Sequence, residues 1–246
     1  YYDQDTELER RIRELSEFLY RRVEWDWAQV RGGLISHGWK PESGMLKHDY
    51  KGYNEAMLLY ILALGSPTHP AREDSWESFI SSCNVTDFYG QPHVNFTPLF
   101  GHQYSHVWVD FRGIQDAFIK EQGIDYFENS RRATYSQRSY AIENPMQWKD
   151  YSATIWGLTA CDGPANTELG YLGGKRRFWT YTARGASAIR RHDDGTIAPT
   201  AAGGSIAFAP EIVIPALKAM VERYGDDLYT QYGFVDAFNP SFQFEA

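Results

Sequence analysis

The stretch from Gly52 to Pro70 carries the carboxylate best placed to do chemistry in this 246-residue chain. From Ala56 to Leu64 almost every residue is apolar, which predicts a helix that is wrapped on all sides by protein. Asn54 is a helix-capping residue type, and Gly65 marks the end of the helix. Glu55 is therefore expected at the mouth of a buried helix. There it is either a surface carboxylate that complements the helix dipole or a catalytic carboxylate at the rim of a cleft.

A second arrangement that suggests chemistry is the pair His102 and His106. Residues four apart share one face of a helix, and zinc ligands use this spacing. No glutamate follows His102 in the metalloprotease pattern, and no cysteine cluster lies nearby. The two histidines are therefore read as polar side chains that line a cleft, and no metal or cofactor is expected.

The aromatic content indicates what such a cleft would bind. Aromatic residues make up 16% of the chain, with 8 Trp, 17 Tyr and 14 Phe. Sugar rings have apolar C–H faces and polar edges, which amphipathic aromatic side chains match. A large aromatic core would use the same residues, and some of them must serve that purpose.

Charge and hydropathy exclude several classes of partner. The net charge of −8 disfavours nucleic acid and anionic membranes. No apolar run approaches the 18 or so residues of a membrane span. The residues Tyr1 to Asp5 have neither the basic nor the apolar region of a signal peptide. Cys83 and Cys161 could pair or remain thiols, so they do not report the compartment.

The elements that must position these residues are mainly helical. Hydrophobic periodicity, caps and breakers predict helices over residues 6–23, 56–64, 74–83, 125–142, 151–158 and 209–224. Residues 34–48 are read as a short hairpin or irregular loop, and residues 165–204 as a long excursion that borders a site. About seven helices joined by long irregular loops indicate a helical toroid or bundle with a cleft at one end, rather than an up-down bundle.

With these segments in hand, the chain resembles the bacterial glucoamylase-like (glycoamylase domain) family. That family includes endo-β-1,2-glucanases and the related domain of cyclic β-1,2-glucan synthases. The runs that carry the resemblance follow the family's order: Gly52–Pro70, Pro98–His106, Asp125–Ala133, Trp156–Pro164, Asp193–Pro210 and Tyr232–Pro240.

The resemblance implies an all-α fold, the (α/α)₆ toroid, with the substrate cleft at one end of the barrel. Residues 1–246 would form one such domain, holding the C-terminal half of the toroid or somewhat more. The upstream helices of the family's toroid would come from a preceding segment or a partner chain. The family also favours a bacterial periplasmic or secreted location.

Glycosidic cleavage usually requires two carboxyl groups, one on each side of the scissile bond. The resemblance points to Glu55 as one of them and implies that its partner lies in the missing half. A helix N-terminus favours an ionised carboxylate and hence a base, whereas a dry aromatic cleft favours the protonated acid. For a dry cleft we expect Glu55 to be the acid. The alternative second carboxylates within this chain are Asp49, Asp110, Glu128, Asp162 and Glu211.

The remaining candidate residues would bind the sugar, although each could equally be structural. Those expected to stack on glucose rings are Trp39, Tyr53, Trp156 and Phe208. Those expected to contact hydroxyl groups are His102, Gln103, Tyr104, His106, Arg131 and Asp162, with Glu211 among the substrate-binding set.

The function expected from this reading is hydrolysis of a glucan, most specifically endo-cleavage of β-1,2-glucan by carboxylate acid–base catalysis. Two alternatives belong to other classes. One is a transglycosylating or carbohydrate-binding module of the cyclic-glucan-synthase type, and the other is an inactive structural half.

Overall fold

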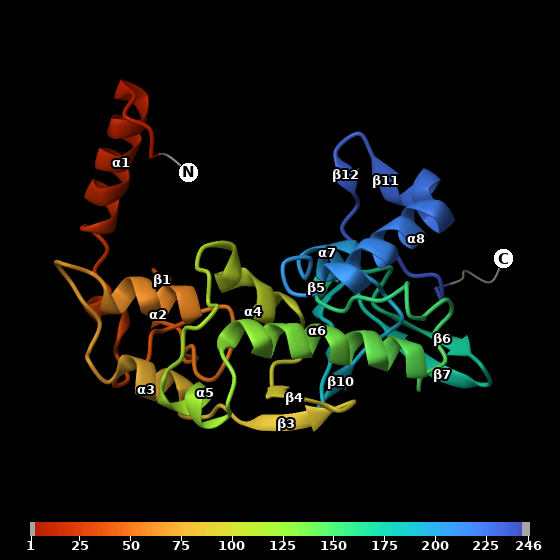
Figure 1. The fold of residues 1–246 in the computed structure, drawn as a ribbon. Coiled ribbons are helices and arrows are strands. Elements are labelled where there is room, and N and C mark those ends of the chain that lie inside the picture. The colour runs from red at the N-terminus through yellow and green to blue at the C-terminus, as the bar shows by residue number, and fades with distance from the viewer. Residues whose placement is uncertain (1–2, 243–246) are drawn as a thin grey trace. The chain divides into compact units, whose positions relative to one another are not determined.

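The computed structural model describes residues 3–242, and its chain divides into two compact units, Tyr1–Cys83 and Asn84–Ala246 (Figure 1). Helices are the longest elements, but six pairs of short antiparallel strands accompany them in the described residues. The expectation of an all-α chain is therefore corrected: the chain is rich in helices and carries many short hairpins.

Over residues 3–83, the first unit contains three α-helices, one 3₁₀ turn and one strand pair. Their bounds are α1 Glu7–Tyr20, η1 Asp26–Ala28, β1 Trp39–Lys40, β2 Gly44–Met45, α2 Met57–Leu64 and α3 Ser75–Ile80. The pair β1–β2 confirms the hairpin expected within residues 34–48, and a bridge between Ser36 and Asp49 extends it.

Helix α1 forms where the amphipathic pattern predicted it. The Thr6 hydroxyl accepts a hydrogen bond from the Glu9 N–H and caps the helix. No residue of α1 is buried, and Leu8 and Leu19 are 70% and 61% exposed. Figure 1 shows the helix extending away from α2 and α3 within the same unit.

Helix α2 begins two residues later than its cap signal suggested. Asn54 Oδ1 accepts a hydrogen bond from the Ala56 N–H at 2.8 Å, so the cap forms a turn just ahead of the helix. The Tyr60 hydroxyl receives the Ile35 N–H and donates to the Tyr50 carbonyl, and burial raises the pKa of Tyr60 to about 12. The helix is not wrapped on all sides as expected, because Leu62 is 38% exposed.

As far as residue 242, the second unit holds five α-helices and most of the described strands. Its elements in the first half are β3 Val85–Phe88, β4 Gln91–Val94, α4 Phe100–Gln103, η2 Tyr104–Val107, α5 Ala117–Glu121 and α6 Tyr126–Glu143. Those in the second half are β5 Ala160–Asp162, β6 Thr167–Tyr171, β7 Gly174–Phe178, β8 Tyr181–Ala183, β9 Gly185–Ala186, β10 Arg191–His192, α7 Pro199–Gly203, α8 Pro210–Leu228, β11 Tyr229–Thr230 and β12 Gly233–Phe234.

Helix α6 organises this unit. The Asp125 carboxylate caps it by accepting the Glu128 N–H at 2.7 Å, and Asn144 ends it in the left-handed conformation, at φ 47°. Its buried side combines apolar residues such as Ala133, Tyr140 and Ala141 with polar ones. Gln137 binds the Leu158 backbone through both its amide atoms, and Asn129 accepts the Val94 N–H. The helix therefore holds neighbouring loops by hydrogen bonds that a hydrophobic pattern does not report.

Two segments differ from the predictions. Residues 151–158 are not a helix, because Gly157 lies at φ 138° and Leu158 bonds with Gln137 and with the Leu99 N–H instead. The excursion 165–204 is not a featureless loop. In β6 the residues alternate between half-buried and exposed, and a turn with positive φ at Leu172 and Gly173 pairs β6 with β7.

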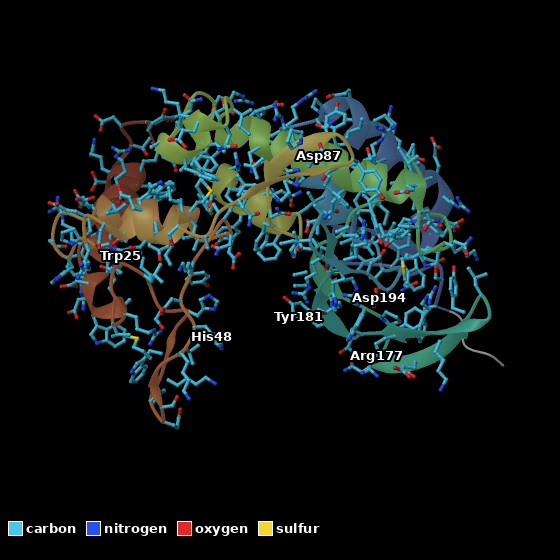
Figure 2. All side chains as sticks on the ribbon, turned by 90° about the horizontal axis from the view of Figure 1, so that it is seen from below. Trp25, His48, Asp87, Arg177, Tyr181 and Asp194 are labelled. Carbon is cyan, nitrogen blue, oxygen red and sulfur yellow. The ribbon has the colours of Figure 1, made fainter. Side chains whose placement is uncertain are left out.

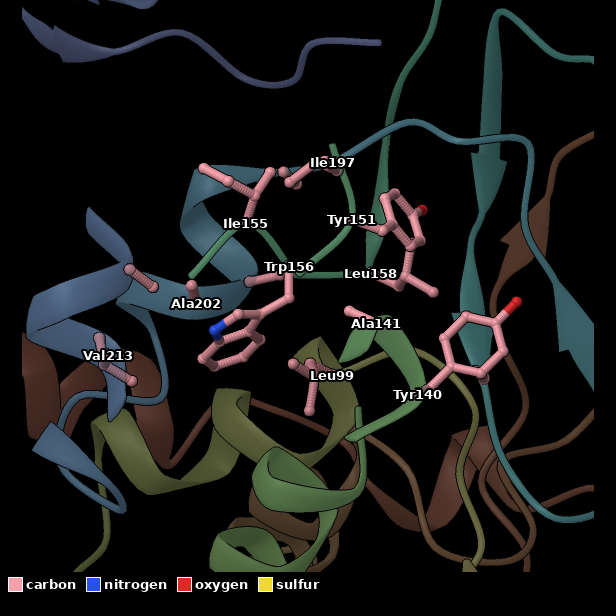
Figure 3. Close-up of a cluster of buried hydrophobic side chains, with 14 of the residues drawn as sticks. Leu99, Tyr140, Ala141, Tyr151, Ile155, Trp156, Leu158, Ile197, Ala202 and Val213 are labelled. Atoms are coloured by element: carbon pink, nitrogen blue, oxygen red, sulfur yellow. The ribbon is translucent and has the colours of Figure 1, made fainter. Parts of the chain in front are cut away.

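The hydrophobic core of the second unit lies between α6, α7 and α8 (Figure 3). Trp156 is fully buried there, close to Leu99, Ala202 and Val213. Pro210 begins α8 at its first turn, as predicted. Among the helices of residues 3–242, none has both the length and the apolar character that crossing a membrane requires.

Candidate functional site

Glu55 lies half-buried in the turn that leads into α2, in the first unit. The Asn54 cap fixes this turn, and the buried Ala56 and Met57 follow it directly. The position matches the prediction of a carboxylate at the start of an apolar helix. Asp49, an alternative carboxylate in the same unit, forms an ion pair with Arg31 and joins the hairpin to the preceding loop.

The two stacking candidates of the first unit differ in exposure. Trp39 is 50% exposed, and its ring centroid lies 6.2 Å from that of Trp27, which is 53% exposed. Tyr53 is buried at 4% exposure. The unit thus offers a pair of accessible indoles, a type of surface that binds apolar sugar faces, whereas Tyr53 packs inside.

The two histidines are held by protein groups in the second unit. His102 Nε2 donates to the Phe96 carbonyl at 3.0 Å, and His106 Nε2 lies 3.0 Å from the Ser130 hydroxyl. Burial lowers the pKa of His102 to about 3 and that of His106 to about 4, so both rings are neutral at pH 7. Among the described residues, no three His, Cys, Asp or Glu side chains come close enough to hold a metal ion.

His106 also lines a cavity of about 230 Å³ at the start of α6. Phe208 packs edge-on against the His106 ring at 4.8 Å and against Phe127 at 5.2 Å. The Arg112 guanidinium lies 4.3 Å from the centre of the Phe127 ring, and Asp110 is at the cavity edge. The cavity therefore combines aromatic walls with charged groups.

A row of polar side chains continues from this cavity along α6. Arg131 and Tyr135 follow Phe127 at intervals of four residues, so the three share one side of the helix. Glu211, in the first turn of α8, accepts a hydrogen bond from the Tyr135 hydroxyl and lies 3.5 Å from Arg131. We call the surface formed by Phe127, Arg131, Tyr135, Phe208 and Glu211 the α6 face.

The charges of the α6 face are set by these contacts. The Tyr135 hydrogen bond, aided by Arg131, lowers the pKa of Glu211 below its usual range. Hydrogen bonds from Arg112 likewise lower the pKa of Asp110. Both carboxylates are therefore ionised at neutral pH, which suits hydroxyl binding or a basic role rather than proton donation.

Of the other predicted residues of the second unit, Glu128 adjoins this row, whereas Gln103, Tyr104 and Trp156 are not part of it. Gln103 Nε2 donates to the Ala201 carbonyl and to the Ser205 hydroxyl, both at 2.7 Å, and thereby joins α4 to α7. Tyr104 begins η2 and is 52% exposed. Trp156 is inside the core, where it packs rather than stacks on a ligand. Glu128 pairs with Arg132 and Arg131 on α6.

Asp162 lies at a different cavity, of about 390 Å³, at the end of β5. The structure thus gathers His106, Phe208, Arg131 and Glu211 at one place and puts Asp162 at another.

Sequence reasoning missed Trp27, Trp108, Arg112 and Asp236, which accompany the predicted residues. A signal existed for Trp27, because two tryptophans lie close together in the run Trp25-Asp26-Trp27.

One half-buried carboxylate, Asp193, has a strongly shifted pKa. It follows β10, and its two oxygens accept hydrogen bonds from the Tyr151 and Tyr140 hydroxyls at 2.7 and 2.8 Å. Burial raises the pKa of Asp193 from its ordinary 3.8 to about 6. A carboxyl group with a shifted pKa can mark a functional site, but both oxygens of Asp193 already accept hydrogen bonds from other residues of the protein.

The shift predicts a pH-dependent stability. The folded state holds the Asp193 proton more tightly than the unfolded state, so this contribution is full below about pH 4 and is lost as pH rises through 6. We expect the stability of the wild type relative to Asp193→Asn to fall by up to about 3 kcal/mol between pH 4 and 7. Urea unfolding of both proteins at several pH values measures this difference, and a constant difference would contradict it.

Residues 47–246 match the family model Glycoamylase, described as "Putative glucoamylase". An exo-β-1,2-glucooligosaccharide sophorohydrolase (non-reducing end) of Parabacteroides distasonis is 28% identical over 97% of this chain.

Solved structures agree in fold over almost the whole chain. A "putative glucoamylase" from Bacteroides uniformis is 32% identical with a TM-score of 0.82, over 98% of this chain and 56% of its own. An endo-β-1,2-glucanase from Chitinophaga pinensis, solved with sophorotriose and glucose, is 27% identical with the same TM-score, over the same two shares. The chain spans 34% of the sophorohydrolase, so it corresponds to part of these proteins.

Proposed function

Because this chain belongs to the glycoamylase family, as its sequence motifs predicted, we propose that it is part of a glycoside hydrolase that cleaves β-1,2-glucan. The observation that carries the proposal is the likeness to a sophorohydrolase and an endo-β-1,2-glucanase, each over at least 97% of this chain. The names of these two relatives, a sophorohydrolase and a glucanase, are those of glycoside hydrolases. The family is therefore one of glycoside hydrolases.

The α6 face supports this proposal by its chemistry. Phe127 offers aromatic surface for the C–H side of a glucose ring, Phe208 packs behind it at 4% exposure, and His106 is a neutral group at the same cavity. Arg131 can donate hydrogen bonds to sugar hydroxyl groups, and Glu211 can accept hydrogen bonds from them. The α6 face is therefore suited to bind a glucan.

The proposed reaction uses Glu55 as the general acid. It protonates the glycosidic oxygen of the leaving glucose while a second carboxylate activates water or attacks the anomeric carbon. Glu55 suits the acid role because it is half-buried at the end of an apolar helix. We propose that the second carboxylate comes from the part of the protein that this chain does not span.

We further propose that the chain is half of an (α/α)₆ toroid and that other helices cover its exposed apolar surfaces. The support is the apolar side of α1, where Leu8, Leu15, Phe18 and Leu19 are exposed, together with the exposed Leu62 of α2. Exposed apolar stripes of this kind normally pack against a neighbour.

Product analysis tests the function. The full-length protein is incubated with a panel of α- and β-linked glucans, and products are separated by chromatography. We expect products from β-1,2-glucan only, with a range of chain lengths for endo-cleavage. Release of sophorose alone would instead indicate exo action. Rearranged chains or rings without new reducing ends would favour a transglycosylating module, and no products from any glucan would refute hydrolysis.

A substitution on the α6 face tests its part in binding. Arg131→Gln removes the cation that faces Glu211, so we expect KM for β-1,2-glucan to rise about tenfold while kcat changes little. Lys218→Gln is the control, because Lys218 is exposed on α8, about two turns after Glu211, and is not part of the α6 face. Unchanged KM in Arg131→Gln would exclude the residue from glucan binding.

A further inference from the structure

A cavity beside Asp162, in the second unit, lies outside the α6 face. It lies between the end of β5, the turn that contains Thr196, and the segment 235–242. Its volume of about 390 Å³ falls within the range of small-molecule sites, roughly 300–1,000 Å³.

The walls of this cavity have two kinds of surface. Phe238, Phe242 and Pro164 provide apolar area, and the carboxylates of Asp162 and Asp236 lie at the same cavity. A pyranose ring has a matching pair of surfaces, with C–H groups on its face and hydroxyl donors at its edge. Carboxylates are strong acceptors for such hydroxyl groups.

The carboxylates keep acceptor capacity for a ligand. Asp236 Oδ2 accepts the Asp162 N–H at 2.7 Å, which fixes the Asp236 side chain. The Asp162 carboxylate has no hydrogen-bond partner in residues 3–242. One anchored carboxylate therefore stands beside one that the rest of the fold does not engage.

The frame behind these groups is rigid. Asn239 donates to the Asp194 carbonyl and the Thr196 hydroxyl and accepts the N–H groups of Ser241 and Phe242. Asp194 in turn forms a fully buried ion pair with Arg184. Because its hydrogen bonds are already used, Asn239 positions the segment that carries Asp236, and the cavity keeps its form without a ligand.

A second cavity of about 400 Å³ adjoins the first, because Val235 and Asp236 line both. Thr200, Phe234 and Leu217 continue the apolar and polar lining on that side. Asp236 therefore stands between two spaces of comparable size, each suited to one sugar ring.

We infer that these two cavities are adjacent saccharide subsites that bind neighbouring pyranose rings of the glucan, with Asp236 between them and Asp162 at one end. This inference rests on the proposed function, since the glucan supplies the linked rings. It assigns Asp236 as a substrate-binding residue.

Sophorose, the β-1,2-linked glucose disaccharide, is the probe. Titration calorimetry on the full-length protein is expected to show binding that Asp236→Asn weakens about tenfold or more, because a hydrogen bond to a charged acceptor is replaced by one to a neutral acceptor. Hydrogen exchange with mass spectrometry is expected to show that sophorose slows exchange in peptides covering 160–166 and 232–242. Asp226→Asn, an exposed aspartate on α8, is the matched control and should bind as the wild type does.

The outcomes separate this inference from the proposed function. If sophorose slows exchange only around the α6 face, and Asp236→Asn binds normally, the subsites are refuted while glucan binding stands. If the protein hydrolyses no glucan yet binds sophorose at 160–166 and 232–242, the proposed hydrolase function is refuted and the saccharide site is supported. If EDTA abolishes sophorose binding, the two carboxylates hold a cation and the direct contact is overturned.

Discussion

Replacing Glu55 with glutamine is expected to lower kcat for β-1,2-glucan hydrolysis by about 10²- to 10⁴-fold, the usual contribution of a general acid. Glutamine keeps the shape and the hydrogen-bonding reach of the side chain but has no proton to give. KM should change little, because the variant keeps the shape and the hydrogen-bonding reach of the side chain. Steady-state kinetics on the full-length protein measure both values.

The role of Glu55 is resolved by the leaving group. An aryl glucoside whose phenol leaves without protonation should lose much less activity in Glu55→Gln than the glucan does. An equal loss on both substrates would assign Glu55 as the nucleophile or base instead. Glu73→Gln, an exposed carboxylate of the same unit, should retain full activity. Wild-type turnover in a correctly folded Glu55→Gln protein would remove Glu55 from catalysis.

The second large effect concerns the Arg184–Asp194 ion pair, in which both side chains are completely buried. Arg184 donates twice to the Asp194 carboxylate and once each to the Cys161 and Trp179 carbonyls. Asp194 lies inside the second unit, near the hairpin that carries Arg177 (Figure 2). The pair thus connects β5, the turn after β10 and the segment after β7.

Removing one partner leaves the other charge buried without its counterion. Asp194→Asn is therefore expected to reduce the free energy of unfolding by about 3–5 kcal/mol. Urea denaturation followed by tryptophan fluorescence measures the change through the shift of the midpoint. Glu17→Gln, which breaks the exposed Glu17–Arg21 pair on α1, should leave the midpoint nearly unchanged.

A double variant distinguishes the pair from its surroundings. Arg184→Met with Asp194→Leu removes both charges, so it should destabilise less than Asp194→Asn if the buried charge is the main penalty. Some loss should remain, because the Trp179 and Cys161 carbonyls and the Thr196 N–H lose their partners. Equal stability of Asp194→Asn and the wild type would show that the pair contributes nothing.

Local signals in the sequence predicted the long helices and the family. Thr6 before α1 and Pro210 at the start of α8 act within a turn of their own position, so neighbouring residues suffice to recognise them. The spacing of Phe127, Arg131 and Tyr135 likewise placed these side chains on one side of α6. The motif runs from Gly52 to Pro240 are linear patterns, and they identified the glycoamylase family without knowledge of the fold.

Predictions were wrong where distant partners decide the backbone. Residues 151–158 have the composition of an aromatic helix, but Gln137 and Leu99 bind the Leu158 backbone, and the core takes Trp156. The hairpins within residues 165–204 depend on strand pairing. The sequence separation between paired strand residues varies, whereas hydrogen-bonded residues in a helix are always four apart.

The sequence by itself determined the composition of the site: which helices form, which carboxylate precedes the apolar helix α2, and which polar residues share a side of α6. Only the tertiary structure decided which of these residues meet. Glu211 reaches Tyr135 across 76 positions of sequence, and Asp236 reaches the Asp162 backbone across 74. Such contacts follow from how α8 and the final segment pack onto the core, and no short-range periodicity encodes that packing.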